Sequence, residues 1–314
     1  MTIYSRGQMQ SVLVAGEVLL DLTRMSGAGM LRFSVFNDGR LAFWEGDRVE
    51  LFLGDWLMFH GFVFAKSRTR NEVIDVLCYD QLRYLQNRDS YRFQGLTASG
   101  IIRRMLQDTG LSVGYLQGTG FVLPERIEQE RSLLDIAQTA IDTTAAFTGQ
   151  LFVLRDVRGR VELRNVRDLA VDTVIHRGNM RMFDYRTDID RTFTAVRLYQ
   201  PDEDGGDGDY VHARSVPGMQ RWGFLQKYVR GTGDVDGQSE ADALLRWHNR
   251  KMRHLRVLDA VGNLSVRGGS LLPVDLDLGD MMVKEFLMVE SVRHKFTENG
   301  HLMDLILVGG EIVD

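Results

Sequence analysis

Short apolar runs of strand length, separated by glycine, aspartate and asparagine, dominate the first 90 residues. The clearest stretch covers residues 46–85 and holds three such runs, at 49–52, 57–64 and 73–79. β-Branched and aromatic residues fill these runs, and no helical period of 3.6 residues fits them. Breaks at Gly54-Asp55 and at the polar segment 66–71 indicate turns. The pattern predicts closely connected antiparallel strands, preceded by two further strands at 18–22 and 30–36.

Helical signals replace the strand runs near Tyr91. Thr97 precedes the apolar face of a first predicted helix, which ends at Gly110. Ser132, with Asp135 three residues later in a capping-box arrangement, begins a second helix that ends at Gly149. Two short runs then predict a hairpin, at 151–154 and 161–163. This middle section, 91–183, is therefore expected to be an α+β domain.

The last section returns to strand patterns. A run at 193–199 alternates well, and the acidic, glycine-rich stretch at 202–209 predicts a solvated loop. That stretch has no glutamate at the spacing that an EF-hand calcium loop needs. Ser239 is expected to begin a helix that carries Leu244, Leu245, Trp247, His248 and Met252. Strands are predicted from residue 264 to the end.

The C-terminal section repeats the pattern of the opening stretch with little identity. The segments 279–283, 286–292, 295–300 and 301–307 parallel 46–49, 57–63, 66–71 and 73–79. The alternative is coincidence, because any two small barrels share strand–turn–strand spacing. Duplication is the favoured interpretation. The expected fold is α+β and mainly β, with two related small β-barrel domains flanking the α+β domain. The predicted domains are 1–90, 91–183 and 184–314, the last with one helix near 239–254.

Composition excludes several classes of function. A chain of 314 residues with 44% hydrophobic content is long enough for two or three domains. Its net charge of −5 disfavours binding of nucleic acid by phosphate neutralisation. The single cysteine, Cys78, cannot form an intrachain disulfide and is interpreted as a small buried hydrophobe. No signal-peptide core and no apolar run of about 20 residues is present, so we expect assembly in the cytoplasm and no membrane partner.

The seven histidines do not predict a metal site. His248 and His254 lie six residues apart on the predicted helix and would point to different faces. His294 and His301 flank a predicted turn and could approach each other. Since no cysteine or glutamate is placed beside them, a histidine in the core or at a hairpin end is favoured over a zinc ligand.

Asp188 and Asp190 bracket Ile189 and are candidates for a catalytic pair of carboxylates. Both would lie on one face of a strand, and paired carboxylates carry out glycoside hydrolysis. Two acids at this spacing beside Arg186 and Arg191 more often form an ion-paired edge. We favour the ion-paired edge.

The remaining candidates are weaker. Glu125, Glu128 and Glu130 are expected in a loop before a helix, where acids favour the N-terminus. Gly118-Thr119-Gly120 alone is too short to indicate a phosphate loop. Four tryptophans are interface anchors or core residues: Trp44, Trp56, Trp222 and Trp247. The sequence thus predicts no catalytic, cofactor-binding or metal-binding residue and no enzyme.

One motif resembles a known family. The segment 79–85 reads Tyr79-Asp80-Gln81-Leu82-Arg83-Tyr84-Leu85 and is similar to a signature of the baseplate hub proteins of contractile phage tails and phage-derived bacteriocins, the late control D-like tail hub family. The resemblance continues through Gly46-Asp47-Arg48-Val49, Thr97-Ala98-Ser99, Ser132-Leu133-Leu134-Asp135-Ile136, Asp188-Ile189-Asp190, Tyr228 after Gly223-Phe224-Leu225-Gln226, and His294 with His301-Leu302-Met303. The first motif is fairly specific. The others are weak individually and support the resemblance because they occur in the same order along the chain. The loop at 202–209 is longer than the pattern needs.

The resemblance implies a structural role. Such a hub is a homotrimer whose chains each contribute two related barrels to a ring, which adapts a hexameric tail tube to a trimeric spike and nucleates assembly. The implied partners are the tail tube protein, the central spike protein and other baseplate components of a phage or bacteriocin particle. No sequence-specific nucleic-acid binding and no cofactor is implied. This leaves open a tail-associated peptidoglycan hydrolase that uses Asp188 and Asp190, and a carbohydrate binder that uses exposed Trp44 or Trp56.

Overall fold

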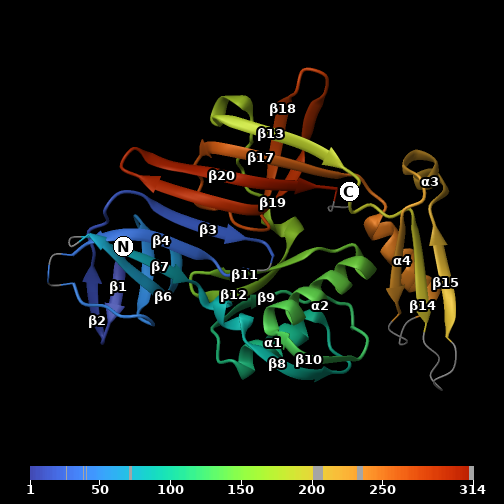
Figure 1. The fold of residues 1–314 in the computed structure, drawn as a ribbon, viewed down its shortest axis with the longest axis horizontal. Helices are drawn as coiled ribbons and strands as arrows, with labels where there is room; N and C mark the ends of the chain where they lie inside the picture. The colour runs from blue at the N-terminus through green and yellow to red at the C-terminus, as the bar shows by residue number, and fades with distance from the viewer. Residues whose placement is uncertain are drawn as a thin grey trace.

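The computed structural model is built around one 12-stranded sheet (Figure 1). It describes residues 1–25, 27–37, 39, 41–70, 73–200, 208–231 and 236–310. The strands of this sheet are β1 (Thr2–Ser5), β2 (Gln8–Ser11), β3 (Val18–Thr23), β4 (Met30–Phe36), β5 (Arg48–Leu53), β6 (Trp56–Arg70), β7 (Val73–Tyr79), β13 (Met182–Asp188), β17 (Met252–Val261), β18 (Leu271–Asp277), β19 (Met282–Thr297) and β20 (Gly300–Gly309). Their order is β13-β17-β20-β19-β3-β4-β7-β6-β5-β1-β2, with β18 also paired to β19. The prediction of a mainly β, α+β fold is confirmed.

The sheet consists of two halves with the same strand order. In the N-terminal half β5-β6-β7-β4-β3 are neighbours, and in the C-terminal half β18-β19-β20-β17-β13 are neighbours. Every one of these pairings is antiparallel. The halves are joined edge to edge by β3 and β19, so they lie together in space, and one hydrophobic core spans both.

Matching backbone hydrogen bonds align the two halves. Val63 accepts from Gly46 N (2.7 Å) and donates to Asp47 O (2.9 Å). Val289 makes the same pair of bonds with Gly269 N and Ser270 O, each 2.8 Å long. Gly46 and Gly269 both have a positive φ, +91° and +86°. Residues 269–270 therefore correspond to 46–47, and the sequence-based alignment of 279–280 with 46–47 was shifted by one strand. Gly279-Asp280 instead lies between β18 and β19, as Gly54-Asp55 lies between β5 and β6.

A helical domain packs below the sheet, in green in Figure 1. It contains the 3₁₀ helix η1 (Gln81–Gln86), β8 (Arg88–Phe93), α1 (Ala98–Asp108), β9 (Val113–Leu116), β10 (Arg126–Ser132), α2 (Leu133–Thr148), β11 (Phe152–Val157), β12 (Arg160–Asn165) and the 3₁₀ helix η2 (Val166–Leu169). A further 3₁₀ helix, η3 (Arg177–Asn179), lies beside β18, where Arg177 donates to Asp277 O. Both predicted helices and the predicted hairpin are confirmed. The Thr97 hydroxyl accepts from Gly100 N (3.2 Å) and that of Ser132 from Asp135 N (3.1 Å), so these side chains satisfy backbone donors that a helix start leaves open.

A small outlying layer follows β13 in the chain. It comprises β14 (Ala195–Gln200), β15 (Asp209–Arg214), α3 (Val216–Trp222), β16 (Gln226–Arg230) and α4 (Gly237–His248), with its own apolar cluster around Val196, Leu198, Ala213 and Ala241. Most of the acidic stretch 202–209 lies outside the described residues.

Three local predictions were wrong. The last predicted helix begins at Gly237, with Asp236 as its N-cap in place of the expected start at Ser239, and ends at His248, where Asn249 caps it. Met252 and His254 belong to strand β17 instead. Residues 66–70 continue β6 as a strand paired with β7, where a turn was expected. Residues 126–132, expected as a loop, form β10 and pair with β8. The buried residue of that strand is Glu128, so the sequence shows no alternation of apolar and polar residues there.

Candidate functional site

The motif 79–85 lies where the two halves of the sheet and the helical domain meet. Asp80 follows β7 and is 3% exposed. Its Oδ2 accepts from Gly29 N (2.8 Å) and its Oδ1 from Leu82 N (3.0 Å). A Cβ at Gly29 would lie 2.5 Å from Asp80 Oδ2, so only glycine allows this approach. Leu82 and Leu85 then enter the core of the helical domain. The motif therefore fixes the passage from the sheet into that domain.

Arg267 completes this junction from the C-terminal half. The side chain is 8% exposed, and its Nη2 donates to Met58 O (2.7 Å) while its Nη1 donates to Asp156 O (3.5 Å). Gln81 Nε2 donates to Asp156 Oδ2 (2.7 Å). Burial raises the pKa values of Asp80 and Asp156 and lowers the pKa of Arg267 to about 10. Two buried acids and one buried cation thus connect β6, β7, β11 and the loop before β18.

His294 and His301 approach each other as the sequence suggested. Nδ1 of His294 lies 2.9 Å from Nε2 of His301, and Nε2 of His294 lies 2.9 Å from Val266 O. His294 is fully buried, and burial with the adjacent His301 lowers its pKa to about 3. Within the described part of the chain no group of three His, Cys, Asp or Glu side chains is placed to hold a metal ion. The pair lies on the β19–β20 hairpin, with His301 half-buried, and burial also lowers the pKa of His301.

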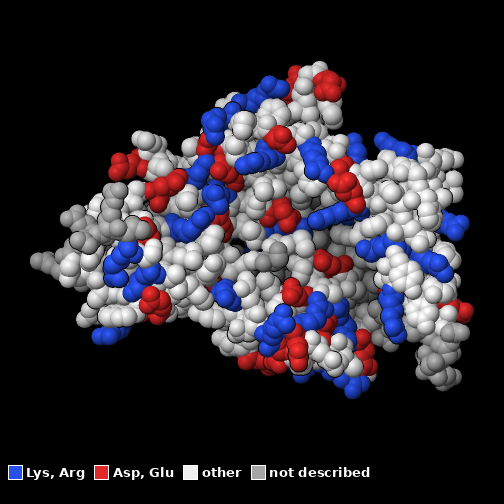
Figure 2. Space-filling view, viewed as in Figure 1, with Lys and Arg blue, Asp and Glu red and all other residues white. Residues whose placement is uncertain are grey.

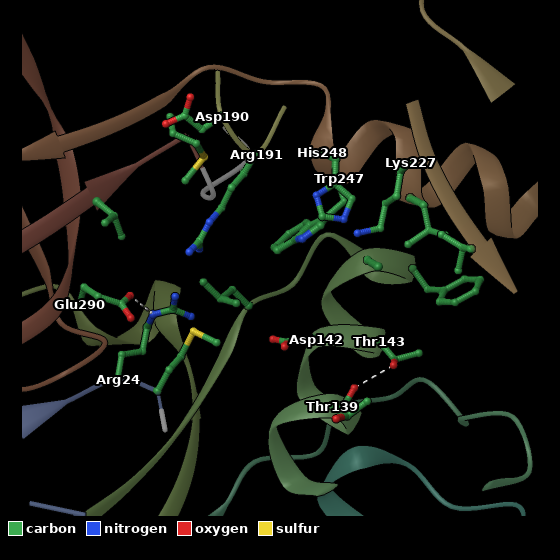
Figure 3. Close-up of a pocket in the computed structure, with 18 of the residues that line it drawn as sticks. Arg24, Thr139, Asp142, Thr143, Asp190, Arg191, Lys227, Trp247, His248 and Glu290 are labelled. Atoms are coloured by element: carbon green, nitrogen blue, oxygen red, sulfur yellow. Dashed lines mark hydrogen bonds and ion pairs between the residues drawn. The ribbon is translucent and has the colours of Figure 1, made fainter. Parts of the chain in front are cut away.

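A cleft of about 1360 Å³ separates the sheet from α2 and α4. Thr139, Asp142 and Thr143 of α2 form one wall, and Trp247 and His248 of α4 another (Figure 3). Burial and the nearby cations Lys227 and Arg250 lower the pKa of His248 to about 4. Basic and acidic residues alternate over the face seen in Figure 2, including the hollow at its centre. The cleft therefore presents no field of a single sign that would select one charged ligand.

Asp188 and Asp190 both line this cleft, and both are ion-paired. Arg186 Nη2 lies 2.8 Å from Asp190 Oδ2 and 3.1 Å from Asp188 Oδ2. His254 Nε2 lies 3.2 Å from Asp188 Oδ2. The two acids end β13 and begin the following turn. This geometry is that of an ion-paired strand edge, the interpretation favoured from the sequence.

The other candidate residues have structural surroundings. Glu128 is buried between Arg126 (2.8 Å) and Arg131 (2.7 Å). Cys78 is buried, and burial raises the pKa of its thiol far above the usual range. Trp44 and Trp56 are each 41% exposed, with Arg6 over the first ring and Arg158 over the second. Trp222 and Trp247 are half-buried. None of the helices described is long and apolar enough to span a membrane.

Besides the terminal strand β2, two strand edges of the sheet lack a strand partner within the described residues. β13 pairs with β17 on one side only. Residues 65–70 of β6 pair with β7 on one side, while β5 covers only residues 56–62 on the other. Unpaired edges are sites where a second chain can add strands.

Comparison with known proteins gives a family and a fold. The family model described as YqbQ-like matches residues 19–308. The phage-like element PBSX protein XkdQ of Bacillus subtilis (strain 168) is 29% identical over 271 residues, which cover 84% of this chain and 82% of that protein.

Solved structures of phage tail proteins share this fold. The 43 kDa tail protein of prophage MuSo2 from Shewanella oneidensis superposes with a TM-score of 0.72 at 13% identity, covering 100% of this chain and 99% of that one. E. coli c3393 has a TM-score of 0.55 at 10% identity, covering 99% and 78%. It is described as a component of the type VI secretion system with structural similarity to T4 bacteriophage tail proteins gp27 and gp5. The fold is thus that of phage tail proteins.

Proposed function

Because the chain belongs to the YqbQ-like family and is similar to XkdQ of the phage-like element PBSX, we propose that it is a structural hub of a tail baseplate. Three copies form a ring that adapts a sixfold tail tube to a threefold spike and nucleates their assembly. The protein is made in the bacterial cytoplasm and ends in the tail of the particle. It catalyses no reaction.

The duplicated half-sheet carries this proposal. Each chain presents two units of the same strand order, β5-β6-β7-β4-β3 and β18-β19-β20-β17-β13. A trimer therefore presents six such units, and the differences between the two units within a chain reduce the symmetry to threefold. A threefold ring with six similar units matches a hexameric neighbour on one face and a trimeric neighbour on the other.

Reconstitution with the neighbouring tail proteins tests this function. The purified chain is mixed with the tail tube and spike proteins encoded beside it, and the products are separated by size. We expect one complex that contains all three proteins, and tube polymerisation that starts from it. Binding to neither protein would contradict the hub function.

A cell-wall zymogram tests the hydrolase alternative. We expect no clearing, since Arg186 pairs with both Asp188 and Asp190. Clearing by the wild-type protein that is lost in Asp188→Ala or Asp190→Ala would establish an enzyme instead.

A further inference from the structure

The two halves of the sheet are joined by the pairing of β3 with β19. Among the described residues, the equivalent edge of β6 has no such partner strand. β3 pairs with residues 291–296 of β19, on the side of β19 where β18 covers residues 282–288. β6 is the counterpart of β19, and β5 is the counterpart of β18. On the corresponding side of β6, residues 65–70 have no strand partner in the part of the chain that the structure describes.

A bulge fixes the alignment of β6 with β19. The pairing of β6 with β7 shifts register between Val63 and Ala65, and that of β19 with β20 shifts between Val289 and Ser291. Ala65 therefore corresponds to Ser291. Residues 65–67 of β6 correspond to 291–293 of β19, which pair with β3, and the pairing of β6 with β7 shifts register again between Ser67 and Arg70.

β13 is the counterpart of β3. β3 pairs with β4 in the N-terminal half as β13 pairs with β17 in the C-terminal half. The strand registers make Met30 of β4 equivalent to His254 of β17. Asp21 pairs with Met30 and Arg186 pairs with His254, so Arg186 is the equivalent of Asp21. Phe183 and Tyr185 then correspond to the buried Val18 and Leu20, and both lie half-buried against the common core. β13 therefore corresponds to the strand that would pair with the open edge of β6.

We infer that β13 of one chain pairs antiparallel with residues 65–70 of β6 of the next chain, which rests on the hub being a trimer. The register copied from β3 and β19 places Arg186 opposite Ser67 and Asp188 opposite Ala65. Each chain offers one edge of each kind, so the contact is head-to-tail and repeats around the ring until it closes. Six half-sheets then form one continuous wall with no edge left open at these strands.

Charge favours this contact over pairing of two identical edges. Residues 65–68 carry Lys66 and Arg68, whereas β13 carries Asp184 and Asp188 with one cation, Arg186. Two β6 edges would place cations opposite one another, which destabilises a strand pair. Joining β6 to β13 brings a basic strand beside a strand of net negative charge.

The junctions within and between chains differ at one end. A Cβ on Gly268 would lie 2.4 Å from Thr23 C and 2.5 Å from Arg24 N, so glycine permits close packing of the internal junction there. The corresponding residue in the N-terminal half is Glu45. The neighbouring chain must therefore turn away after Asp188, and the register is tested best at Arg186.

A disulfide between Ser67→Cys and Arg186→Cys tests the pairing. Arg24 N donates to Glu290 O (2.8 Å), so residues 24 and 290 form a hydrogen-bonded pair and, by alternation, Asp21 and Arg293 form a non-hydrogen-bonded one. The equivalent pair, 186 and 67, then has Cα atoms about 4.5 Å apart, within the range of a disulfide. The native Cys78 is buried and does not compete.

We expect most of the oxidised double variant to run as a covalent trimer on a non-reducing gel, and to return to single chains on reduction. The two single variants, and Ser67→Cys combined with Tyr210→Cys on exposed β15, are matched controls that stay uncrosslinked. In wild-type trimer, amides of residues 65–70 and of β13 are expected to exchange more slowly than in monomer obtained by dilution.

The outcomes separate the contact from the function. A trimer by mass whose double variant does not crosslink, and whose two edges exchange rapidly, overturns the strand pairing and leaves the hub function standing. Crosslinked dimers without trimer overturn the head-to-tail ring. A chain that is monomeric both alone and with the spike protein refutes the hub itself.

Discussion

Replacing Arg267 by methionine is expected to lower the free energy of unfolding by about 1–3 kcal/mol, the usual cost of leaving a buried hydrogen-bond acceptor without its donor. Asp80 and Asp156 would remain buried without their nearby cation. Met58 O would also lose the donor that lies 2.7 Å from it. Urea unfolding followed by circular dichroism measures the effect.

Arg256→Met is the matched control, because the same chemical change is made at an exposed position of the sheet. Its effect should stay within about 0.5 kcal/mol. Adding Asp156→Asn to Arg267→Met should recover part of the lost stability, since it neutralises one of the uncompensated acids. Equal losses for Arg267→Met and Arg256→Met would show that the junction at Asp80 does not depend on the buried cation.

Replacing His294 by glutamine is expected to remove about 2 kcal/mol of the stability that the wild type loses between pH 7.5 and pH 5. The pKa of His294 is lowered to about 3 in the folded chain, against about 6.5 when exposed. The unfolded chain therefore binds more protons in this window. Stability from the neutral histidine is fully present above pH 6.5 and is lost progressively as the pH falls toward 3.

Unfolding by urea at pH 7.5 and pH 5 measures this difference. The raised pKa values of Asp80 and Asp156 act in the opposite direction, because those acids gain protons more readily in the folded chain, but they do so equally in both proteins. His212→Gln, at an exposed strand position, is the control and should unfold with the pH dependence of the wild type. An unchanged pH dependence in His294→Gln would contradict a neutral buried histidine.

The regular elements could be predicted from sequence because each has a local cause. Runs rich in β-branched and aromatic residues define β4 and β7, and the hydroxyls of Thr97 and Ser132 mark the two helix starts. Glu128 shows the limit of that approach. A strand whose one buried side chain is an ion-paired glutamate carries no apolar period.

The junction at Asp80 could be predicted only in part. The motif 79–85 stood out as a pattern, but its partners Gly29, Asp156 and Arg267 come from distant segments. Arg267 lies in a glycine-rich loop without periodicity, so no sequence signal marked it as buried. The duplication was detectable as repeated strand–turn–strand spacing. Its alignment required the hydrogen bonds of Val63 and Val289, because hairpins of similar length match equally well when shifted by one strand.

Six similar half-sheets in a ring of three chains are the central claim, and the mass of the purified protein in solution tests it most directly. Light scattering is recorded on the protein alone at high concentration and with the spike protein. We predict a particle of about 107 kDa, three times the chain mass of 35.8 kDa, with one spike trimer added when the spike protein is present. A mass of one chain in both samples would contradict the account.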